Sequence, residues 1–387
     1  MSRLNILFVM VGTAGMGGSE RLVHSLARRL DRTRFSPSVA WLDGSDAPQE
    51  FRDLQVPLYL VRKSKRLDFA AMRELARIVD RERIDVVNAQ HFMPVVYAYY
   101  GCNLAARKPL VYTAHSRWEV EDMPLKWRLA GGYLLSRIGA SVGVTADASA
   151  AIQRVFGLSA SHVVTIENGV ELDRFTMQRE VRGLRASLGL AEGDVVIGSV
   201  ANLKRVKNHL FLLQAFARVA RENERVKLLI VGQGFKGEAD NTDEELRRFV
   251  SASRLENRVL FLGYRTDIPE LLKVMDIFCL TSLQEGLPIG LIEAMAAGLP
   301  VVGTNVQGIR DVIAPDVDGI LLEPGDVPGL QGALTRLIGD PSRRLRLGHA
   351  GREKAERKYS LEVCVREYEQ LFLSLASARA RCGMPQD

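Results

Sequence analysis

Short runs of Val, Ile and Leu alternate along this chain with longer segments in which apolar residues recur at helical spacing. In the first half, the runs typical of strands are Asn5–Val11, Ser38–Leu42, Val56–Val61, Asp85–Asn88, Leu110–Thr113, Ser141–Thr145 and Val163–Glu167. The segments typical of helices include Glu20–Leu30, Phe69–Arg81 and Leu125–Arg137. This alternation predicts parallel strands joined by crossover helices, because parallel neighbours need a long connection.

The alternation then begins again. The second series of strand-like runs is Val195–Val200, Val226–Val231, Val259–Leu262, Asp276–Leu280, Pro300–Thr304 and Gly319–Leu322. The helical segments among them are Asn208–Arg221, Asp243–Ser253, Gly290–Ala297 and Val327–Ile338. Between the two series stand the turn signal Asn168-Gly169 and the charged, aperiodic segment Glu171–Arg185.

We therefore predict an α/β protein of two Rossmann-like, doubly wound parallel-sheet domains, residues 1–180 and 181–360, that face a central cleft. Ligands of such domains bind outside the carboxyl ends of the strands. The densely charged segment Arg343–Ala378 is typical of a helix. We expect its last part, with residues 361–387, to be a C-terminal helix that can cross back to the first domain.

Composition and charge narrow the function classes. Of the 387 residues, 47% are hydrophobic and 25% are charged, as in globular proteins, and no run approaches the roughly 20 apolar residues that span a bilayer. Four cysteines and six histidines are scattered without metal-ligand spacing, so we expect no metal site and a cytoplasmic location. The net charge of +6 suits anionic substrates, nucleic acid or acidic lipid without choosing among them.

The first candidate site is a glycine-rich loop, Gly12–Glu20, between the first strand and the first helix. Glycines such as Gly17 and Gly18 let the backbone approach an anion, and a helix start offers free N–H groups. The spacing matches neither the dinucleotide-binding fingerprint nor a P-loop. A tight strand-to-helix turn would explain the same residues.

The second candidate is the basic segment Lys204-Arg205-Val206-Lys207, after the first strand of the second domain. A diphosphate would be met by the point charge of Lys207 or by the bidentate fork of Arg205. The alternative interpretation is a solvated basic turn, and we expect Lys204 at the surface.

The third candidate is Glu285–Val302, which places Glu285 and Glu293 on either side of a predicted helix start. Carboxylates accept hydrogen bonds from paired hydroxyls, and a helix N-terminus binds anions. The pair therefore suits a ligand with hydroxyls on both sides of a diphosphate. The alternatives are a charge that complements the helix dipole at Glu285 and a surface residue at Glu293.

Taken together, these motifs resemble the retaining GT-B glycosyltransferases of glycosyltransferase family 4. The most specific part is Glu285-x7-Glu293, with Gly-Leu-Pro inside it and Glu-Ala-Met-Ala-Ala-Gly-Leu-Pro-Val-Val at its end. The resemblance covers essentially the whole chain through Gly17–Glu20, Thr113–Ser116, Glu167–Glu171, Val231–Gly234 and Leu262–Arg265. It implies a hexosyltransferase that moves a sugar from a UDP- or GDP-sugar to a hydroxyl acceptor in polysaccharide or glycolipid biosynthesis. The first domain would then bind the acceptor and the second the nucleotide sugar.

The resemblance also implies a role for each matching residue. Glu293 would hold the ribose hydroxyls and Glu285 the hydroxyls of the sugar ring, whereas His115 would contact the donor sugar near its reacting carbon. Arg205 and Lys207 would neutralise the leaving diphosphate. The other implied donor contacts are Gly17, Gly18, Asn202, Gly234, Arg265, Gly286, Leu287, Pro288, Ile289, Gly290 and Leu291.

The chain departs from the family pattern at Asn202, where family members often carry the arginine of Gly-Arg-Leu. Arg205 or Lys204 must then supply the second cation. A satisfied histidine at a strand end is the alternative for His115. The histidines interpreted as structural or surface residues are His24, His91, His162 and His349.

Breaking the anomeric C–O bond leaves negative charge on the diphosphate, so stabilising the leaving group is the main chemical task. Lys207, Arg205 and a helix N-terminus can do this, and we expect no metal and no cofactor beyond the nucleotide sugar as co-substrate. Retention of configuration would normally invite a carboxylate nucleophile. The resemblance implies instead attack on the face from which the leaving group departs.

The acceptor is expected to be a saccharide or a lipid-linked molecule. The basic cluster Arg62–Arg66 precedes a predicted helix, Leu67–Arg83, whose apolar positions form a stripe. A basic cluster beside an amphipathic helix suits an anionic membrane, so peripheral contact with the inner face of the membrane is one prediction. A solvated loop and a core-facing helix are the alternative. The stripe comprises Leu67, Ala71, Leu75, Ile78 and Val79.

Two other enzyme classes stay open at the level of the sequence. An NAD-dependent oxidoreductase would also carry a glycine loop after its first strand and an acidic residue after its second, where Asp43 stands. A nucleotide-sugar epimerase of the same fold would form product without an acceptor. Nucleic acid is not expected as a partner, because the chain has no interleaved aromatics and no recognised module.

Overall fold

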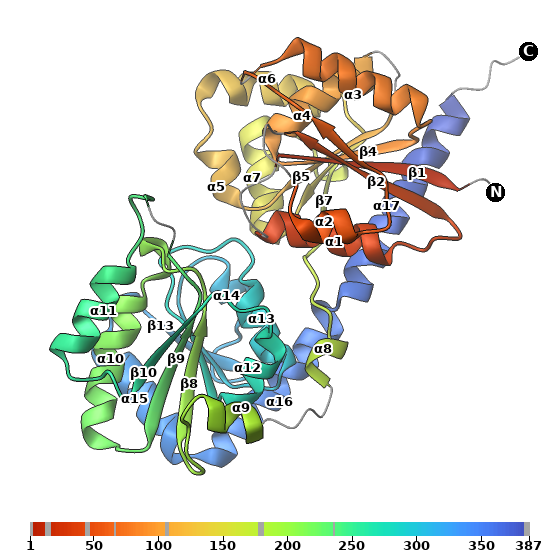
Figure 1. Ribbon diagram of the computed structural model, residues 1–387. Helices are drawn as coiled ribbons and strands as arrows, with labels where there is room; N and C mark the ends of the chain where they lie inside the picture. Colours follow the sequence, from red (N-terminus) through yellow and green to blue (C-terminus); the bar gives the residue numbers. More distant parts are fainter. Residues whose placement is uncertain are drawn as a thin grey trace, which may run out of the picture. The chain divides into compact units, whose positions relative to one another are not determined.

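The computed structural model describes residues 3–11, 17–42, 47–65, 67–104, 108–176, 182–234 and 237–382. The chain separates into two compact units, residues 1–169 with 361–387 and residues 170–360 (Figure 1). Each unit contains a parallel sheet with helices on both faces, which confirms the predicted class of two doubly wound α/β domains. Of the residues singled out above, Gly12–Met16, Asp43 and Arg66 lie outside the described part of the chain.

The first unit is built on a seven-stranded sheet in the order β3-β2-β1-β4-β5-β6-β7. Its strands are β1 (Leu4–Met10), β2 (Phe35–Leu42), β3 (Leu58–Val61), β4 (Val86–Gln90), β5 (Leu110–Ala114), β6 (Ala140–Gly143) and β7 (Val163–Thr165). Its helices are α1 (Gly18–Arg29), α2 (Gln49–Asp53), α3 (Phe69–Arg81), α4 (Phe92–Ala98), α5 (Arg117–Glu121), α6 (Leu125–Leu135), α7 (Ala146–Phe156) and α17 (Leu361–Cys382).

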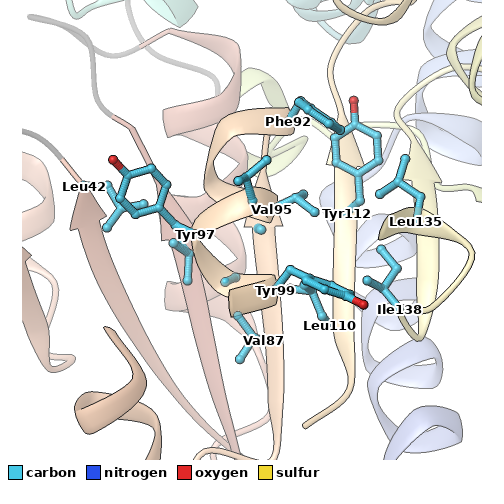
Figure 2. Close-up of a cluster of buried hydrophobic side chains, with 14 of the residues drawn as sticks. Leu42, Val87, Phe92, Val95, Tyr97, Tyr99, Leu110, Tyr112, Leu135 and Ile138 are labelled. Carbon is cyan, nitrogen blue, oxygen red and sulfur yellow. The ribbon is translucent and has the colours of Figure 1, made fainter. Parts of the chain in front are cut away.

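Both faces of this sheet are covered, which explains why β1 is apolar throughout. Successive side chains of a strand point to opposite faces. Accordingly Leu7 and Val9 pack with α3 and α4 in one core, whereas Ile6 and Phe8 pack with α1 and α17 in another. Figure 2 shows the first of these cores, in which the rings of Phe92 from α4 and Tyr112 from β5 meet nearly at right angles.

The second unit is built on a six-stranded parallel sheet in the order β10-β9-β8-β11-β12-β13. Its strands are β8 (Val195–Val200), β9 (Val226–Val231), β10 (Val259–Gly263), β11 (Ile277–Leu280), β12 (Val301–Thr304) and β13 (Gly319–Leu322). Its helices are α8 (Asp173–Thr176), α9 (Arg182–Ser187), α10 (His209–Glu222), α11 (Asp243–Ala252), α12 (Ile268–Val274), α13 (Ile289–Ala296), α14 (Ile309–Val312), α15 (Val327–Gly339) and α16 (Pro341–Lys358).

The boundaries of the units differ from those predicted. The chain enters the second unit at Val170 instead of near residue 180, because Val170 and Phe175 are buried in the core of the second unit. The predicted helical segment Arg343–Ala378 is broken between α16 and α17. The break is fixed by Val170, whose N–H donates to the carbonyl of Tyr359 at 2.8 Å and which forms a parallel bridge with Ser360. Helix α16 belongs to the second unit and α17 to the first.

The apolar stripe predicted on residues 67–83 faces the protein core. Its members Ala71, Leu75, Ile78 and Val79 are buried against the sheet, and only Leu67, which precedes α3, is exposed. Helical periodicity alone does not distinguish a core-facing stripe from a membrane-facing one. In this protein the stripe packs into the core of the first unit. No helix within the described ranges combines the length and apolar character needed to cross a membrane.

The contact between α13 and α16 depends on a glycine. A Cβ atom at Gly348 of α16 would lie 2.0 Å from the carbonyl oxygen of Gly298, which follows α13. We expect Gly348→Ala to destabilise the protein by about 1–3 kcal/mol, because backbone must move to admit the methyl group. Differential scanning fluorimetry should show a lower Tm than for Gly339→Ala, where no described atom lies within 4 Å of the new Cβ. Equal Tm values for the two variants would contradict this account of the contact.

Candidate active site

An ion pair marks the point at which the strand order of the second sheet reverses. Strand β8 lies between β9 and β11, and the loops that follow β8 and β11 diverge at this point. Lys207 follows β8 and Glu285 follows β11. The Nζ of Lys207 lies 2.7 Å from Oε1 and 2.9 Å from Oε2 of Glu285. The fold therefore joins two of the predicted site residues directly.

Neighbouring groups hold this pair in place. The N–H of Leu283 donates to the carbonyl of Val206 at 2.8 Å, which ties the two loops together. The hydroxyl of Ser282 donates to Oε1 of Glu285 at 2.6 Å. Only 24% of the Lys207 side chain and 9% of the Glu285 side chain are exposed. Partial burial strengthens these charge-assisted hydrogen bonds.

Helix α13 begins beside the same pair, after Pro288, and Glu293 is buried one turn into it. The first amides of a helix have no acceptor within it, so they are available to an anion. Two glycines allow the close approach of this segment. A Cβ at Gly290 would lie 3.0 Å from the carbonyl oxygen of Val200, and one at Gly308, where φ is +84°, would lie 2.2 Å from that of Gly286.

The two cations proposed to replace the family arginine differ in their pairing. Lys204 lies 2.7 Å from Glu238, and this carboxylate raises the pKa of Lys204 through its hydrogen bond. The guanidinium of Arg205 is 65% exposed and lies 3.9 Å from Glu245. Arg205 is thus the less tightly held of the two.

The remaining predicted residues of the second unit lie at the ends of neighbouring strands. Asn202 is exposed after β8. A Cβ at Gly234 would lie 1.9 Å from Oδ1 of Asn241, so packing within the unit already requires glycine there. Arg265 follows the edge strand β10 and donates from Nε to Asp267 at 2.7 Å, a bond that raises the pKa of the guanidinium. Strand β9 lies between β10 and β8, so Arg265 follows a strand two places from the one that precedes Lys207.

In the first unit the strand order reverses beside β1, which lies between β2 and β4. Gly17 and Gly18 begin α1 after β1. A Cβ at Gly17 would lie 2.7 Å from Oε2 of Glu20, whereas no described atom comes within 4 Å of a Cβ at Gly18. A side chain at position 17 would therefore have to displace the flexible end of Glu20, whereas the space around a Cβ at Gly18 is open within the described structure.

His115 directly follows β5 and lies beside a second histidine, His91, that the sequence interpretation treated as a structural or surface residue. The rings of His91 and His115 lie with centroids 4.7 Å apart. Nε2 of His115 lies 2.8 Å from Oε1 of Gln90, and Nδ1 of His91 lies 2.9 Å from Oε2 of Glu119. These four residues form one polar cluster at the carboxyl ends of β4 and β5.

The carboxylate of Glu119 is the centre of this cluster. It accepts hydrogen bonds from the backbone N–H of His115 and of Phe92, both at 3.1 Å, and from the hydroxyl of Tyr112 at 3.2 Å. Burial opposes its ionisation, but His91 and the hydrogen bond from the backbone of His115 lower the pKa of Glu119 below its usual value. Burial likewise opposes the charge of His91, yet Glu119 raises the pKa of His91. Burial and the charge of His91 lower the pKa of His115 to about 3.

Sequence reasoning missed Gln90, His91 and Glu119. A usable signal was Ser116-x-x-Glu119, the pattern of a helix capping box, directly after His115. The hydroxyl of Ser116 does accept from the N–H of Glu119 at 3.2 Å. The Glu119 carboxylate, however, reaches past the helix start to His91 and Phe92, which no local pattern predicts.

Two family models match the chain in succession. The model described as Glycosyltransferase Family 4 matches residues 16–174, and the model described as Glycosyl transferases group 1 matches residues 181–354. The chain is a glycosyltransferase of the family that these two models together describe. The resemblance to glycosyltransferases is thereby confirmed, and retention of configuration stays a prediction. Neither an oxidoreductase nor an epimerase is favoured by these matches.

Curated relatives and solved structures agree with this membership. N-acetyl-alpha-D-glucosaminyl L-malate synthase of Bacillus anthracis is 27% identical over 329 residues, 83% of each chain. The UDP-Gal:alpha-D-GlcNAc-diphosphoundecaprenol alpha-1,3-galactosyltransferase of Escherichia coli is 26% identical over 70% of this chain and 71% of its own. The structure of Anabaena HepE in complex with UDP-glucose superimposes with a TM-score of 0.83 at 23% identity, over 96% of this chain and 100% of that one. The glycosyltransferase has the GT-B fold.

Asp-x-Asp spacing occurs in this glycosyltransferase at Asp316–Asp318. Both aspartates form ion pairs with cations of the same chain. Asp318 is 2.8 Å from Nζ of Lys354, and Asp316 is 2.8 Å from the guanidinium of Arg343. Within the described ranges, no group of three or more His, Cys, Asp or Glu side chains is placed to hold a metal ion.

A buried histidine beside Lys207 gives the glycosyltransferase a testable pH dependence. His209 begins α10, and neither of its ring nitrogens has a hydrogen-bond partner among the described residues. Burial and the Lys207 charge lower the pKa of His209 from 6.5 to about 4. Between these values the unfolded chain binds the proton and the folded chain does not, so stability falls as pH falls from 6.5 towards 4.

We expect His209→Gln to reduce the loss of Tm between pH 7.5 and pH 5, because glutamine has no proton to take up. Thermal unfolding at both pH values measures the difference. The matched control is His349→Gln on the exposed surface of α16, which should keep the wild-type pH dependence. The same loss of Tm in His209→Gln and wild type would show that His209 does not contribute.

Proposed function

We propose that this glycosyltransferase transfers the sugar of a UDP- or GDP-sugar, with retention of configuration, to a hydroxyl of a saccharide or lipid-linked acceptor in the cytoplasm. The Lys207–Glu285 pair, placed at a topological switch point beside the start of α13, is the observation that carries this proposal. Relatives support the donor class, because the Escherichia coli enzyme is named for UDP-Gal and HepE is described in complex with UDP-glucose.

The pair offers both kinds of group that such a donor needs. An ammonium has three donors, so Lys207 can turn from Glu285 to the diphosphate. The carboxylate of Glu285 is then free to accept from hydroxyls of the sugar ring, while the amides at the start of α13 meet the phosphate and Glu293 holds the ribose. Arg205 is the better second cation, since Lys204 is already held by Glu238.

The chemistry follows from where charge develops. As the anomeric C–O bond breaks, its electron pair goes to the diphosphate, and Lys207, Arg205 and the helix start stabilise the charge that results. We propose that this stabilisation needs no metal and no further cofactor. The acceptor hydroxyl then attacks the face that the diphosphate leaves, and its proton passes to the leaving phosphate. For His115 and the Gly17–Gly18 loop of the first unit we propose the donor contacts that the resemblance implies.

We expect Lys207→Ala and Glu293→Ala each to lower the turnover of the nucleotide sugar at least ten-fold, because each removes a group that the donor requires. A panel of UDP- and GDP-sugars in a thermal-shift assay identifies the donor, since a ligand of the folded state raises Tm. Turnover is then measured with that donor, with and without EDTA, to test whether a metal is needed. Proton NMR of the product gives its anomeric configuration.

The matched control for Lys207→Ala is Lys354→Ala. Lys354 also pairs with a buried carboxylate of the second unit, at 2.8 Å from Asp318. Its removal should affect stability and leave turnover per folded molecule unchanged. Near-wild-type turnover in both Lys207→Ala and Glu293→Ala would refute the assignment, and a product of inverted configuration would refute retention.

We also propose that the first unit contacts an anionic membrane, through α6 rather than through the buried stripe of α3. Leu125, Leu129 and Tyr133 lie on one face of α6, with 70%, 70% and 59% of their surface exposed. Exposed cations flank this stripe, because Lys126 follows Leu125 and the guanidinium of Arg137 lies 3.8 Å from the ring centre of Tyr133. An apolar stripe bordered by cations matches the chemistry of an acidic lipid surface.

Replacing Leu125 and Leu129 together by Ser should lower binding to anionic vesicles about ten-fold or more, because the apolar area that would leave water is lost. Co-sedimentation with phosphatidylglycerol–phosphatidylcholine vesicles measures it, with pure phosphatidylcholine for comparison. The control is Leu345→Ser on α16, where 74% of the leucine is exposed in the second unit. Vesicle binding that does not change with lipid charge or with the α6 substitutions would exclude this surface as a membrane contact. If a second copy of the chain covers the α6 stripe instead, sedimentation velocity would show a dimer.

A further inference from the structure

The polar cluster of the first unit contains more groups than the proposed chemistry uses. Gln90, His91 and Glu119 surround His115 and come from three different elements, the end of β4, the start of α4 and helix α5. Figure 2 shows Phe92 and Tyr112, which anchor the neighbouring core. Both also donate to Glu119, so the cluster is built onto the core of the unit.

We propose that Gln90, His91 and Glu119 are positioning residues, which hold His115 with its Nε2–H bonded to Gln90 and its Nδ1 open to a hydroxyl of the donor sugar. The inference rests on the proposed function for the role of His115, but the state of the imidazole itself is a property of the free protein.

A chain of amides determines which nitrogen of His115 carries the proton. Nδ2 of Asn88 donates to Oγ1 of Thr113 at 3.1 Å, and Oδ1 of Asn88 accepts from Nε2 of Gln90. Gln90 therefore turns its carbonyl oxygen to His115, and only an N–H can make the 2.8 Å contact with it. The other nitrogen, Nδ1, keeps its lone pair and has no hydrogen-bond partner in the described part of the chain.

Glu119 fixes the place of His115 and the charge beside it. The Glu119 carboxylate accepts from the backbone N–H of His115 and from the ring of His91, so both residues are tied to one anion. His91 has φ of +68° and ψ of 164°, a strained backbone conformation that residues other than glycine rarely adopt. The bonds from His91 and from the N–H of Phe92 to Glu119 maintain it.

An uncharged His115 suits the proposed reaction. The sugar gathers positive charge as its leaving group departs, so an imidazolium close to the reacting carbon would raise the barrier. The titratable groups that face the histidine pair are Glu119 from α5, Tyr112 from β5 and Glu20 from α1. Burial opposes a charge on both rings, but Glu119 and Glu20 raise the pKa of His91, whereas burial and His91 lower the pKa of His115.

The first test needs no catalysis. Long-range 1H–15N NMR of histidine-labelled wild-type protein reports the tautomer of each imidazole, and His115→Gln assigns the signal of His115. We expect a neutral His115 protonated at Nε2 throughout pH 5.5–8.5. His162, whose Nε2 is 2.7 Å from the carbonyl of Leu135, is an internal reference for this tautomer. A His115 protonated at Nδ1, or charged at pH 7, would overturn the proposal.

The second test converts the acceptor of His115 into an anion. In Gln90→Glu the new carboxylate stabilises an imidazolium at His115, so kcat should fall about ten-fold between pH 8.5 and pH 6 relative to wild type and recover at high pH, with KM for the donor changed less. A merely structural defect would not reverse with pH. The control Gln370→Glu, on the exposed surface of α17, adds the same charge and should keep the wild-type profile.

Glu119→Gln completes the design, because it removes the anion and retains most of the side-chain shape. The NMR titration of His91 should move to lower pH in this variant, whether or not it turns over substrate. An unchanged pH profile in Gln90→Glu, with the expected tautomer in wild type, would exclude positioning of His115 as a catalytic requirement. Absence of sugar transfer by the wild-type protein with every donor would instead count against the proposed function and leave the NMR result standing.

Discussion

Parallel strands end at a common edge, and in each sheet of this protein the strand order reverses beside the first strand of the unit. The loops after β1 and β4, and those after β8 and β11, must diverge at these points, because their connections run to opposite sides. Gly17 and His91 occupy the first divergence and Lys207 and Glu285 the second. The candidate site residues of the glycosyltransferase therefore lie where the loops diverge, because no adjacent loop covers their side chains and backbone amides there.

Much of this arrangement could be predicted from the sequence. The strands were predictable because a strand covered on both faces is a continuous apolar run, as in β1 and β9. The proximity of Lys207 and Glu285 followed from their positions after strands of one sheet, together with the family resemblance. What the motif could not give was their state in the free protein, in which each neutralises the other.

The features that escaped prediction depend on contacts distant in sequence. The cation at Lys204 is held by Glu238, a residue of another loop, so its charge could not be judged from its own segment. The sequence pattern did not reveal the exposed stripe of α6, because that helix is apolar on several sides: Leu135 is buried, whereas Leu129 is exposed to solvent. Periodicity reports contrast between faces, and it is weak where both the core and the surface of a helix are apolar.

The carboxylates of Glu285 and Glu119 differ in whether their hydrogen-bond partners can be replaced by a ligand. Glu285 is bonded by the side chains of Lys207 and Ser282, which can rotate away when a ligand offers other partners. Glu119 is bonded by two backbone amides, which cannot leave unless the ends of β5 and α4 move. The cations differ likewise, since lysine stays charged at any physiological pH and histidine does not. A side chain held by rotatable partners suits a group that meets the donor, and one held by the backbone suits a group that keeps another residue in place.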